Sequence, residues 1–176
     1  MHMTDPIDFA AERISNLIKK LNPEETVEVE VMNYSLSLGM NLLLTVSFIM
    51  AIGFMTNTAL STLLSFLIFA VQRFFVKGFH FKSLTLCVLV TTTLIASIPH
   101  LPLPQLAITP IGIVCTLIIL YKAKVKPIAK LIPFFVIAIG MILQDSVIIL
   151  ACAAQAITLV PKGGDFNVEY TRKKNC

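Results

Sequence analysis

A cysteine and a histidine lie seven residues apart in the segment 72–87, QRFFVKGFHFKSLTLC, between two apolar stretches. Cys87 supplies a thiol, and His80 supplies an imidazole that can accept the thiol proton, as in enzymes that use a cysteine nucleophile. A thiol is mostly protonated near neutral pH, so a nucleophilic cysteine needs a base or positive charge beside it. Arg73, Lys77 and Lys82 place positive charge in the same segment. The pattern therefore indicates a thiol nucleophile with its base.

The same two residues also have a purely structural interpretation. Cysteine is a common buried hydrophobe, and a histidine is often found where a membrane helix meets water. Geometry adds a condition to the catalytic interpretation, because seven residues of continuous helix span about 10 Å, too far for a hydrogen bond. We therefore expect the chain around 78–83 to bend, with Gly78 supplying the backbone freedom. The residues alone leave both interpretations open.

The segment resembles the signature of the accessory gene regulator B (AgrB) family. The shared features are Arg73, Gly78, His80, a lysine at 82, Cys87, an amphipathic N-terminus, a basic loop, and the ending QAITLVP at 155–161. One position differs, because many members carry two glycines before the histidine motif and the first is Lys77 here. The resemblance implies a membrane-embedded cysteine endopeptidase that processes precursors of cyclic quorum-sensing peptides in Gram-positive bacteria.

By this resemblance, Cys87 attacks a carbonyl of a small peptide precursor, with His80 as general base. The C-terminal part of the precursor leaves, and a cysteine or serine of the remaining peptide then closes a thiolactone or lactone ring. The supporting and substrate-binding residues predicted around the pair are Arg73, Lys77, Gly78, Lys82 and Ser83. The precursor implied by the family carries an amphipathic leader and an acidic tail.

The composition indicates how these residues are held. Of 176 residues, 56% are hydrophobic and only 14% are charged, and the charges gather between apolar runs, as in integral membrane proteins. We therefore expect an all-α integral membrane protein that forms a single polytopic domain over residues 1–176. Its expected parts are an amphipathic N-terminal region at 1–34, a bundle of about six transmembrane helices at 35–160, and a cytoplasmic tail at 161–176.

Helix signals divide the N-terminal region. Asp5-Pro6 predicts a helix start, and apolar residues follow at helical spacing to Leu21, which predicts an amphipathic helix lying on the membrane surface. Asn22-Pro23 followed by two glutamates predicts a second start, for a helix that enters the bilayer near Tyr34.

The apolar runs predict the spans. The first four are expected at about 35–54, 59–75, 84–98 and 106–121, separated by a polar turn at 56–57, the site segment and a proline-rich loop at 99–104. The last block, 131–160, would be about 45 Å long as one helix, which exceeds the thickness of a bilayer. Two short spans that turn at Gln144-Asp145 are the alternative, and the basic flanks on both sides of the block favour this hairpin.

Charge predicts the orientation. The lysine-rich loop at 122–130 and the basic tail are both expected in the cytoplasm, which requires an even number of crossings between them. The same rule places the segment 72–87 and both termini on the cytoplasmic side of a bacterial cell membrane. Asp145 then lies on the opposite side from Cys87, so we exclude it from the site and interpret it as a turn residue.

Other functions and ligands are less well indicated. The four cysteines form no metal-binding pattern, and Cys115 and Cys152 are expected to be buried among apolar residues. We predict no metal, no cofactor and no nucleic-acid partner; membrane lipids and a second copy of the chain are further candidate partners. The alternative function is a small non-enzymatic transport or scaffold subunit in which His80 and Cys87 are incidental. A carrier would more typically carry paired ionisable residues within its spans or an internal repeat, and only Asp145 is of that kind.

Overall fold

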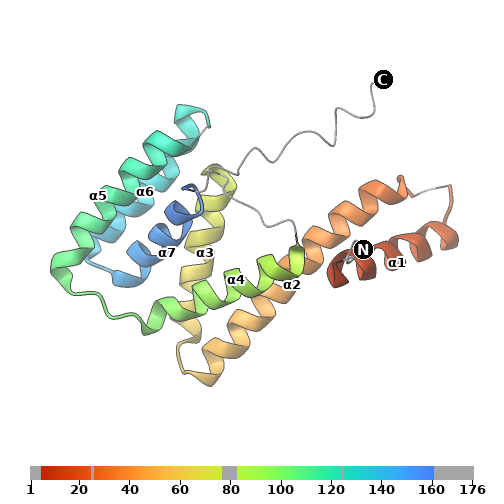
Figure 1. The fold of residues 1–176 in the computed structure, drawn as a ribbon, viewed down its shortest axis with the longest axis horizontal. Helices are drawn as coiled ribbons and strands as arrows, with labels where there is room; N and C mark the ends of the chain where they lie inside the picture. The colour runs from red at the N-terminus through yellow and green to blue at the C-terminus, as the bar shows by residue number, and fades with distance from the viewer. Residues whose placement is uncertain (1–4, 25, 77–82, 124, 161–176) are drawn as a thin grey trace. The chain divides into compact units, whose positions relative to one another are not determined.

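The computed structural model describes residues 5–24, 26–76, 83–123 and 125–160. The regular secondary structure in these residues is all helical, and no strand occurs among them (Figure 1). The helices are α1 Pro6–Leu21, α2 Val29–Met55, α3 Ala59–Val76, α4 Leu84–Ser97, the short 3-10 helix η1 Ile98–His100, α5 Gln105–Lys122, α6 Pro127–Leu143 and α7 Ser146–Ile157. The predicted all-helical class is confirmed, and each predicted span falls on a helix.

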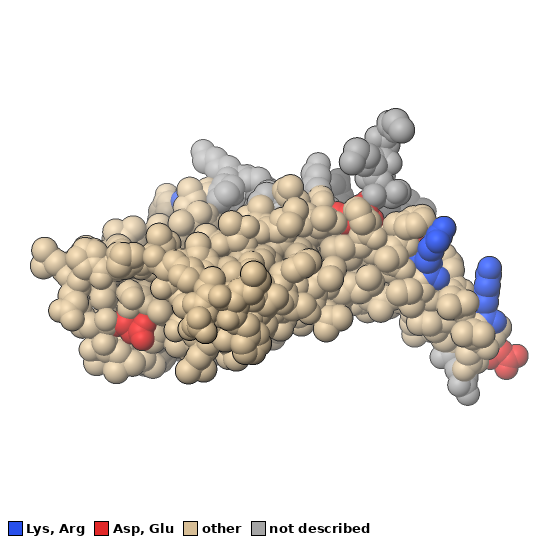
Figure 2. Space-filling model, turned by 90° about the horizontal axis from the view of Figure 1, so that it is seen from below, with Lys and Arg blue, Asp and Glu red and all other residues tan. Residues whose placement is uncertain are grey.

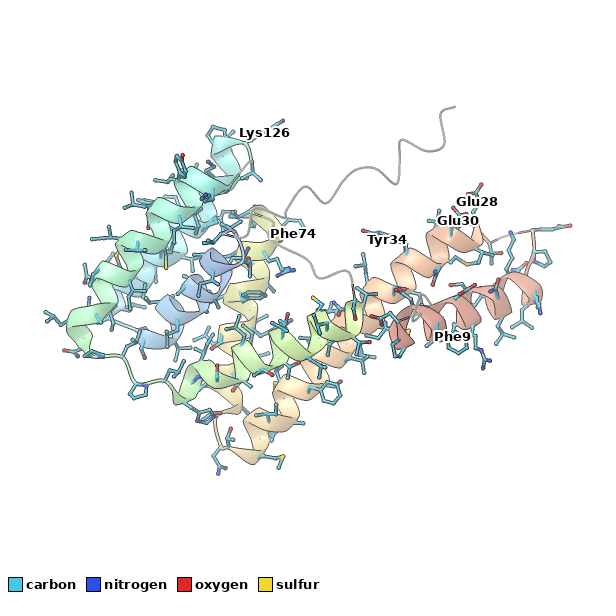
Figure 3. The ribbon with its side chains drawn as sticks, viewed as in Figure 1. Phe9, Glu28, Glu30, Tyr34, Phe74 and Lys126 are labelled. Carbon is cyan, nitrogen blue, oxygen red and sulfur yellow. The ribbon has the colours of Figure 1, made fainter. Side chains whose placement is uncertain are left out.

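Helix α1 begins as the sequence predicts. Asp5 is its N-cap and accepts a hydrogen bond from the Ile7 backbone N–H at 3.0 Å, with Pro6 in the first turn. One side of the helix is buried through Ile7, Ala11 and Ser15. Exposed large apolar residues occupy other positions, among them Leu17 and also Phe9, which is labelled in Figure 3. The helix is therefore amphipathic, with apolar residues left over on its outer surface.

The predicted start of the second helix at Asn22 is wrong, because α2 begins only at Val29. Side chains occupy the backbone carbonyls that a helix starting at Asn22 would use for its first intrahelical hydrogen bonds. The Lys19 ammonium donates to the carbonyls of Pro23 and Thr26, both at 2.8 Å, and the Thr26 hydroxyl donates to the Asn22 carbonyl at 2.7 Å. The described part of this connection is therefore held as a loop. Glu28 and Glu30 lie where α2 starts (Figure 3).

The chain divides into two compact units. Unit 1 comprises residues 1–51 and 81–93, and so contains α1, most of α2 and the first part of α4. A hydrogen bond from the Ser37 hydroxyl to the Asp8 carboxylate, at 3.0 Å, joins α2 to α1. Ile49, Cys87 and Val88 are among the buried residues of this unit.

Unit 2 comprises residues 52–80 and 94–176, and α7 lies at its centre. Helix α7 contacts α3, α5, α6 and η1, and most of its residues are buried (Figure 1). Two glycines allow close packing in this unit: a Cβ added at Gly140 of α6 would lie 2.7 Å from the Ile148 side chain of α7, and one added at Gly112 of α5 would lie 2.7 Å from Met141 of α6. The core of unit 2 therefore forms around its shortest α-helix.

Two predicted turns are confirmed. Gln144 ends α6 in the left-handed conformation, with φ of 51°, and Asp145 caps α7 by accepting hydrogen bonds from the backbone N–H groups of Val147 and Ile148. Asp145 is thus the turn residue that the sequence indicates. Asn57, with φ of 57°, makes the equivalent turn between α2 and α3, where a short polar side chain tolerates this conformation.

Three of the described helices, α2, α3 and α5, are long and apolar enough to cross a membrane. Three shorter helical segments are also apolar: Leu84–His100, α6 and α7. Most of the described residues drawn in Figure 2 are uncharged, and a few Lys, Arg, Asp and Glu side chains lie among them. These helices are those of a membrane protein, while the count of six spans and the single-domain organisation stay predictions.

Candidate active site

Cys87 lies in the first turn of α4, within unit 1. Its backbone N–H donates to the Ser83 carbonyl at 3.1 Å, and the Ser83 hydroxyl accepts from the Leu86 N–H at 3.2 Å. Ser83 therefore caps the helix that carries the cysteine. The N-terminal end of a helix favours negative charge, which is the charge that a nucleophilic thiol acquires.

The Cys87 side chain is only 6% exposed. Its sulfur lies 4.0 Å from the hydroxyl of Thr91, one turn further along α4. Residues four apart share a helix face, so the spacing of the cysteine and this threonine could have indicated their contact from the sequence alone. The thiol is thus shielded from bulk solvent and has one weak polar neighbour on its own helix.

Asp5 brings the start of α1 to the start of α4. Its carboxylate accepts hydrogen bonds from the Ser83 hydroxyl at 2.6 Å, the Thr85 hydroxyl at 2.7 Å and the Thr85 backbone N–H at 3.1 Å, besides the bond from Ile7. Burial raises the pKa of Asp5, but the hydrogen bonds outweigh it and lower the pKa from 3.8 to about 2. The carboxylate is therefore ionised at neutral pH.

The remaining predicted site residues are placed as follows. Arg73 lies near the end of α3 in unit 2, with its guanidinium 5.5 Å from the centre of the Phe69 ring. Helix α3 ends at Val76 and α4 begins at Leu84, and four predicted residues between them lie outside the described residues: Lys77, Gly78, His80 and Lys82. The pairing of Cys87 with His80 accordingly stays a prediction.

The other described cysteines belong to the interior of unit 2. Cys115 and Cys152 are buried, as the sequence predicts. The amide of Gln72, itself fully buried, donates to the Cys152 sulfur at 2.6 Å. The Gln72 side chain thus extends from α3 to α7. Among the described residues, no three acidic, histidine or cysteine side chains gather as a metal site would require.

Comparison with known proteins identifies the family. No curated protein and no solved structure matches the chain. A family model described as Accessory gene regulator B matches residues 11–159, from within α1 to just beyond the end of α7, with Cys87 inside the match. The resemblance seen in the segment 72–87 therefore extends over most of the sequence, and the chain belongs to the accessory gene regulator B (AgrB) family.

Proposed function

We propose that this protein is a membrane-embedded cysteine endopeptidase that cleaves a small peptide precursor and promotes cyclisation of the product. The family takes part in processing the precursors of autoinducing peptides. The observation that carries the proposal is the place of Cys87, a shielded thiol in the capped first turn of α4. His80 acts as the general base.

The reaction proceeds through a thioester. His80 takes the proton of the Cys87 thiol, and the sulfur attacks the carbonyl carbon of the scissile peptide bond. The carbon–nitrogen bond then breaks, and the imidazolium gives its proton to the leaving amine. A thiol or hydroxyl of the bound peptide loses its proton to His80 and attacks the thioester, which closes the ring and returns the electron pair to the Cys87 sulfur. Exchange between two thioesters is nearly isoenergetic, so a thiolactone forms without ATP.

The first turn of α4 restricts where the oxyanion of the tetrahedral intermediate is stabilised. Such intermediates are usually stabilised by backbone N–H groups near the nucleophile. Here the N–H groups of Thr85, Leu86 and Cys87 already donate to Asp5, to the Ser83 hydroxyl and to the Ser83 carbonyl. The oxyanion therefore needs a donor other than these three N–H groups, and the basic residues of the segment 72–87 supply the positive charge that such a site requires. Gly78 supplies the backbone freedom that this mechanism needs.

The precursor is recognised by its amphipathic leader and acidic tail. The exposed apolar residues of α1 are suited to the membrane surface where an amphipathic leader also lies. The lysines at 122–130 suit an acidic tail on the cytoplasmic side. This recognition is proposed together with a topology of six spans in a bacterial cell membrane and both termini in the cytoplasm.

The test uses the protein in nanodiscs with a synthetic precursor. Cys87→Ala is expected to lower cleavage by more than about a thousandfold, because the acyl group then has no acceptor. Cys115→Ala and Cys152→Ala serve as matched controls and are expected to retain activity, since both residues pack in the interior of unit 2. Mass spectrometry of the quenched wild-type reaction should show the peptide attached to Cys87. Precursor cleavage by the Cys87→Ala protein would contradict the proposal, and a wild-type protein that does not cleave the precursor would favour the transport or scaffold alternative.

A further inference from the structure

One carboxylate receives hydrogen bonds from the starts of two helices in unit 1. Oxygen Oδ1 of Asp5 accepts from the Ile7 N–H and the Thr85 hydroxyl, and oxygen Oδ2 accepts from the Ser83 hydroxyl and the Thr85 N–H. An ordinary N-cap accepts only from its own helix. Asp5 caps α1 and at the same time satisfies a backbone donor in the first turn of α4.

These bonds immobilise the turn that carries Cys87. The hydroxyl of Ser83 donates to Asp5 while it accepts from Leu86, and the N–H of Thr85 is held by the same carboxylate. Helix ends fray when their first N–H groups lack acceptors. Because Asp5 and Ser83 supply these acceptors, the backbone of the turn is held in place, and with it the direction of the Cα–Cβ bond of Cys87.

Helix α1 has a separate attachment that does not involve α4. Asp8, three residues after Asp5, accepts from the Ser37 hydroxyl of α2 at 3.0 Å. Ile7, Ala11 and Ser15 are buried along the same helix. Loss of the Asp5 bonds is therefore expected to release the first turn of α4 without detaching α1, and Asp8 provides a control of the same charge on the same helix.

We propose that Asp5 is a positioning residue for the Cys87 nucleophile, and that it does so by fixing the first turn of α4 to the start of α1. The proposal rests on the function proposed for Cys87. Asp5 contacts neither the substrate nor the thiol, and acts only through Ser83 and Thr85.

The first measurement does not depend on proteolysis. In full-length protein in nanodiscs, with Cys115, Cys152 and Cys176 replaced by serine, the rate of Cys87 alkylation by an uncharged maleimide is compared among variants. Asp5→Asn is expected to raise this rate roughly tenfold, because a frayed first turn exposes the buried thiol. Asp8→Asn is expected to leave it within about twofold of the parent rate. Equal alkylation rates in all three proteins would overturn the proposal whatever the activity of Cys87.

The second measurement is precursor cleavage with all cysteines in place. Asp5→Asn is expected to lower kcat about tenfold while KM changes less than about twofold, because a misdirected nucleophile still binds its substrate. Thr85→Val keeps the side-chain shape and removes only one donor, so a fall in kcat of roughly threefold is expected; this milder variant decides the matter if Asp5→Asn does not fold. An unchanged kcat in Thr85→Val, or an equal loss in Asp5→Asn and Asp8→Asn, would contradict positioning. Cleavage by Cys87→Ala would instead contradict the proposed function. The alkylation rates would then decide by themselves whether Asp5 fixes the turn that carries Cys87.

Discussion

Asp5 is the described residue whose charge is tied most closely to the structure of unit 1. Four hydrogen bonds hold its carboxylate and lower its pKa from 3.8 to about 2. A carboxylate with a lowered pKa in the folded state stabilises that state at every pH above its ordinary pKa. The stabilisation declines as the pH falls from about 3.8 to about 2, where the folded protein also takes up the proton.

This linkage predicts an acid-dependent difference between wild type and Asp5→Asn. The wild type should unfold at a higher temperature than the variant, by a constant margin above about pH 5, because Asp5 is then ionised in both the folded and the unfolded state. The margin should shrink between about pH 4 and pH 2. Thermal unfolding in detergent, followed by circular dichroism, measures it. A margin that widens as the pH falls would contradict the assigned role of the carboxylate, and Asp8→Asn gives the reference for a single lost charge.

A second prediction at this scale concerns the reactivity of Cys87 with iodoacetamide. If His80 and the neighbouring basic residues stabilise the thiolate, Cys87 should react faster at mildly acidic pH than a simple thiol, whose pKa is about 8.5. His80→Ala should bring the rate close to that of a simple thiol. Lys77→Ala and Lys82→Ala should each cause a partial loss that high salt reduces. A rate-versus-pH curve that is the same with and without His80 would leave Cys87 as a packing residue.

At the scale of residues, local spacing could be read from the sequence and distant contacts could not. The spacing of His80 and Cys87 identified the candidate nucleophile, because both residues lie in one short segment. The N-cap role of Asp5 was also predictable, because a cap and its helix are adjacent. The bonds from Asp5 to Ser83 and Thr85 were not, because about 80 residues separate the partners and no periodic pattern connects them.

At the scale of elements, α2 contains two glycines in contrasting surroundings. A Cβ added at Gly53 would lie 2.9 Å from the Ala59 backbone and close to the Thr62 side chain, so α3 approaches α2 here more closely than any other residue allows. A Cβ added at Gly39 would meet nothing within 4 Å. The two positions therefore separate the effect of packing from the effect of helix propensity.

We expect Gly53→Ala and Gly39→Ala to change stability in opposite directions. Gly53→Ala should lower the free energy of unfolding by about 1–3 kcal/mol, because backbone atoms cannot move aside as a flexible side chain can. Gly39→Ala should raise it by up to about 1 kcal/mol, because alanine is the better helix former. Thermal unfolding of both variants in the same detergent tests the pair. A destabilised Gly39→Ala protein would indicate a contact at that position with a partner outside the chain.

Helix starts show why some elements were predicted correctly and one was not. Asp5 and Asp145 both cap the helices that follow them, and in each case the signal lies within three residues of the bonds that it explains. The start of α2 was misplaced because Lys19, in the preceding helix, binds the carbonyls of Pro23 and Thr26. Capping patterns consider only residues next to a helix start, so they cannot predict a bond from a long side chain in the preceding helix.

At the scale of the whole molecule, the described helices carry apolar residues on their exposed faces as well as on their buried faces. Leu42, Leu43, Leu117 and Phe135, on three different helices, are each about half exposed or more. Large apolar side chains exposed in such numbers mark a surface that contacts lipid or another apolar partner. The apolar runs predicted the spans and charge predicted their even number after the basic loop, while among the described helices only α2, α3 and α5 are both long and apolar enough to cross a membrane.

The proposed six-span topology predicts a labelling pattern. In a cysteine-free background, Lys126→Cys and Asn175→Cys should both resist a membrane-impermeant maleimide applied to intact cells, because both positions face the cytoplasm. Gln105→Cys should react, because the loop before α5 faces outward. The assay compares labelling before and after permeabilisation. Labelling of Asn175→Cys but not of Lys126→Cys would mean an odd number of crossings between them.

The central position of α7 has a consequence for the order of assembly during translation. A chain synthesised as far as Asp145 contains α3, α5 and α6 but lacks the helix that all three contact in unit 2. Until α7 leaves the ribosome, the buried Gln72 of α3 has no Cys152 to which it can donate. Unit 1, whose residues all precede position 94, does not wait for α7. Cys87 and the residues bonded around it are therefore synthesised before α5, α6 and α7, and we expect unit 2 to be the last part of the chain to complete its packing.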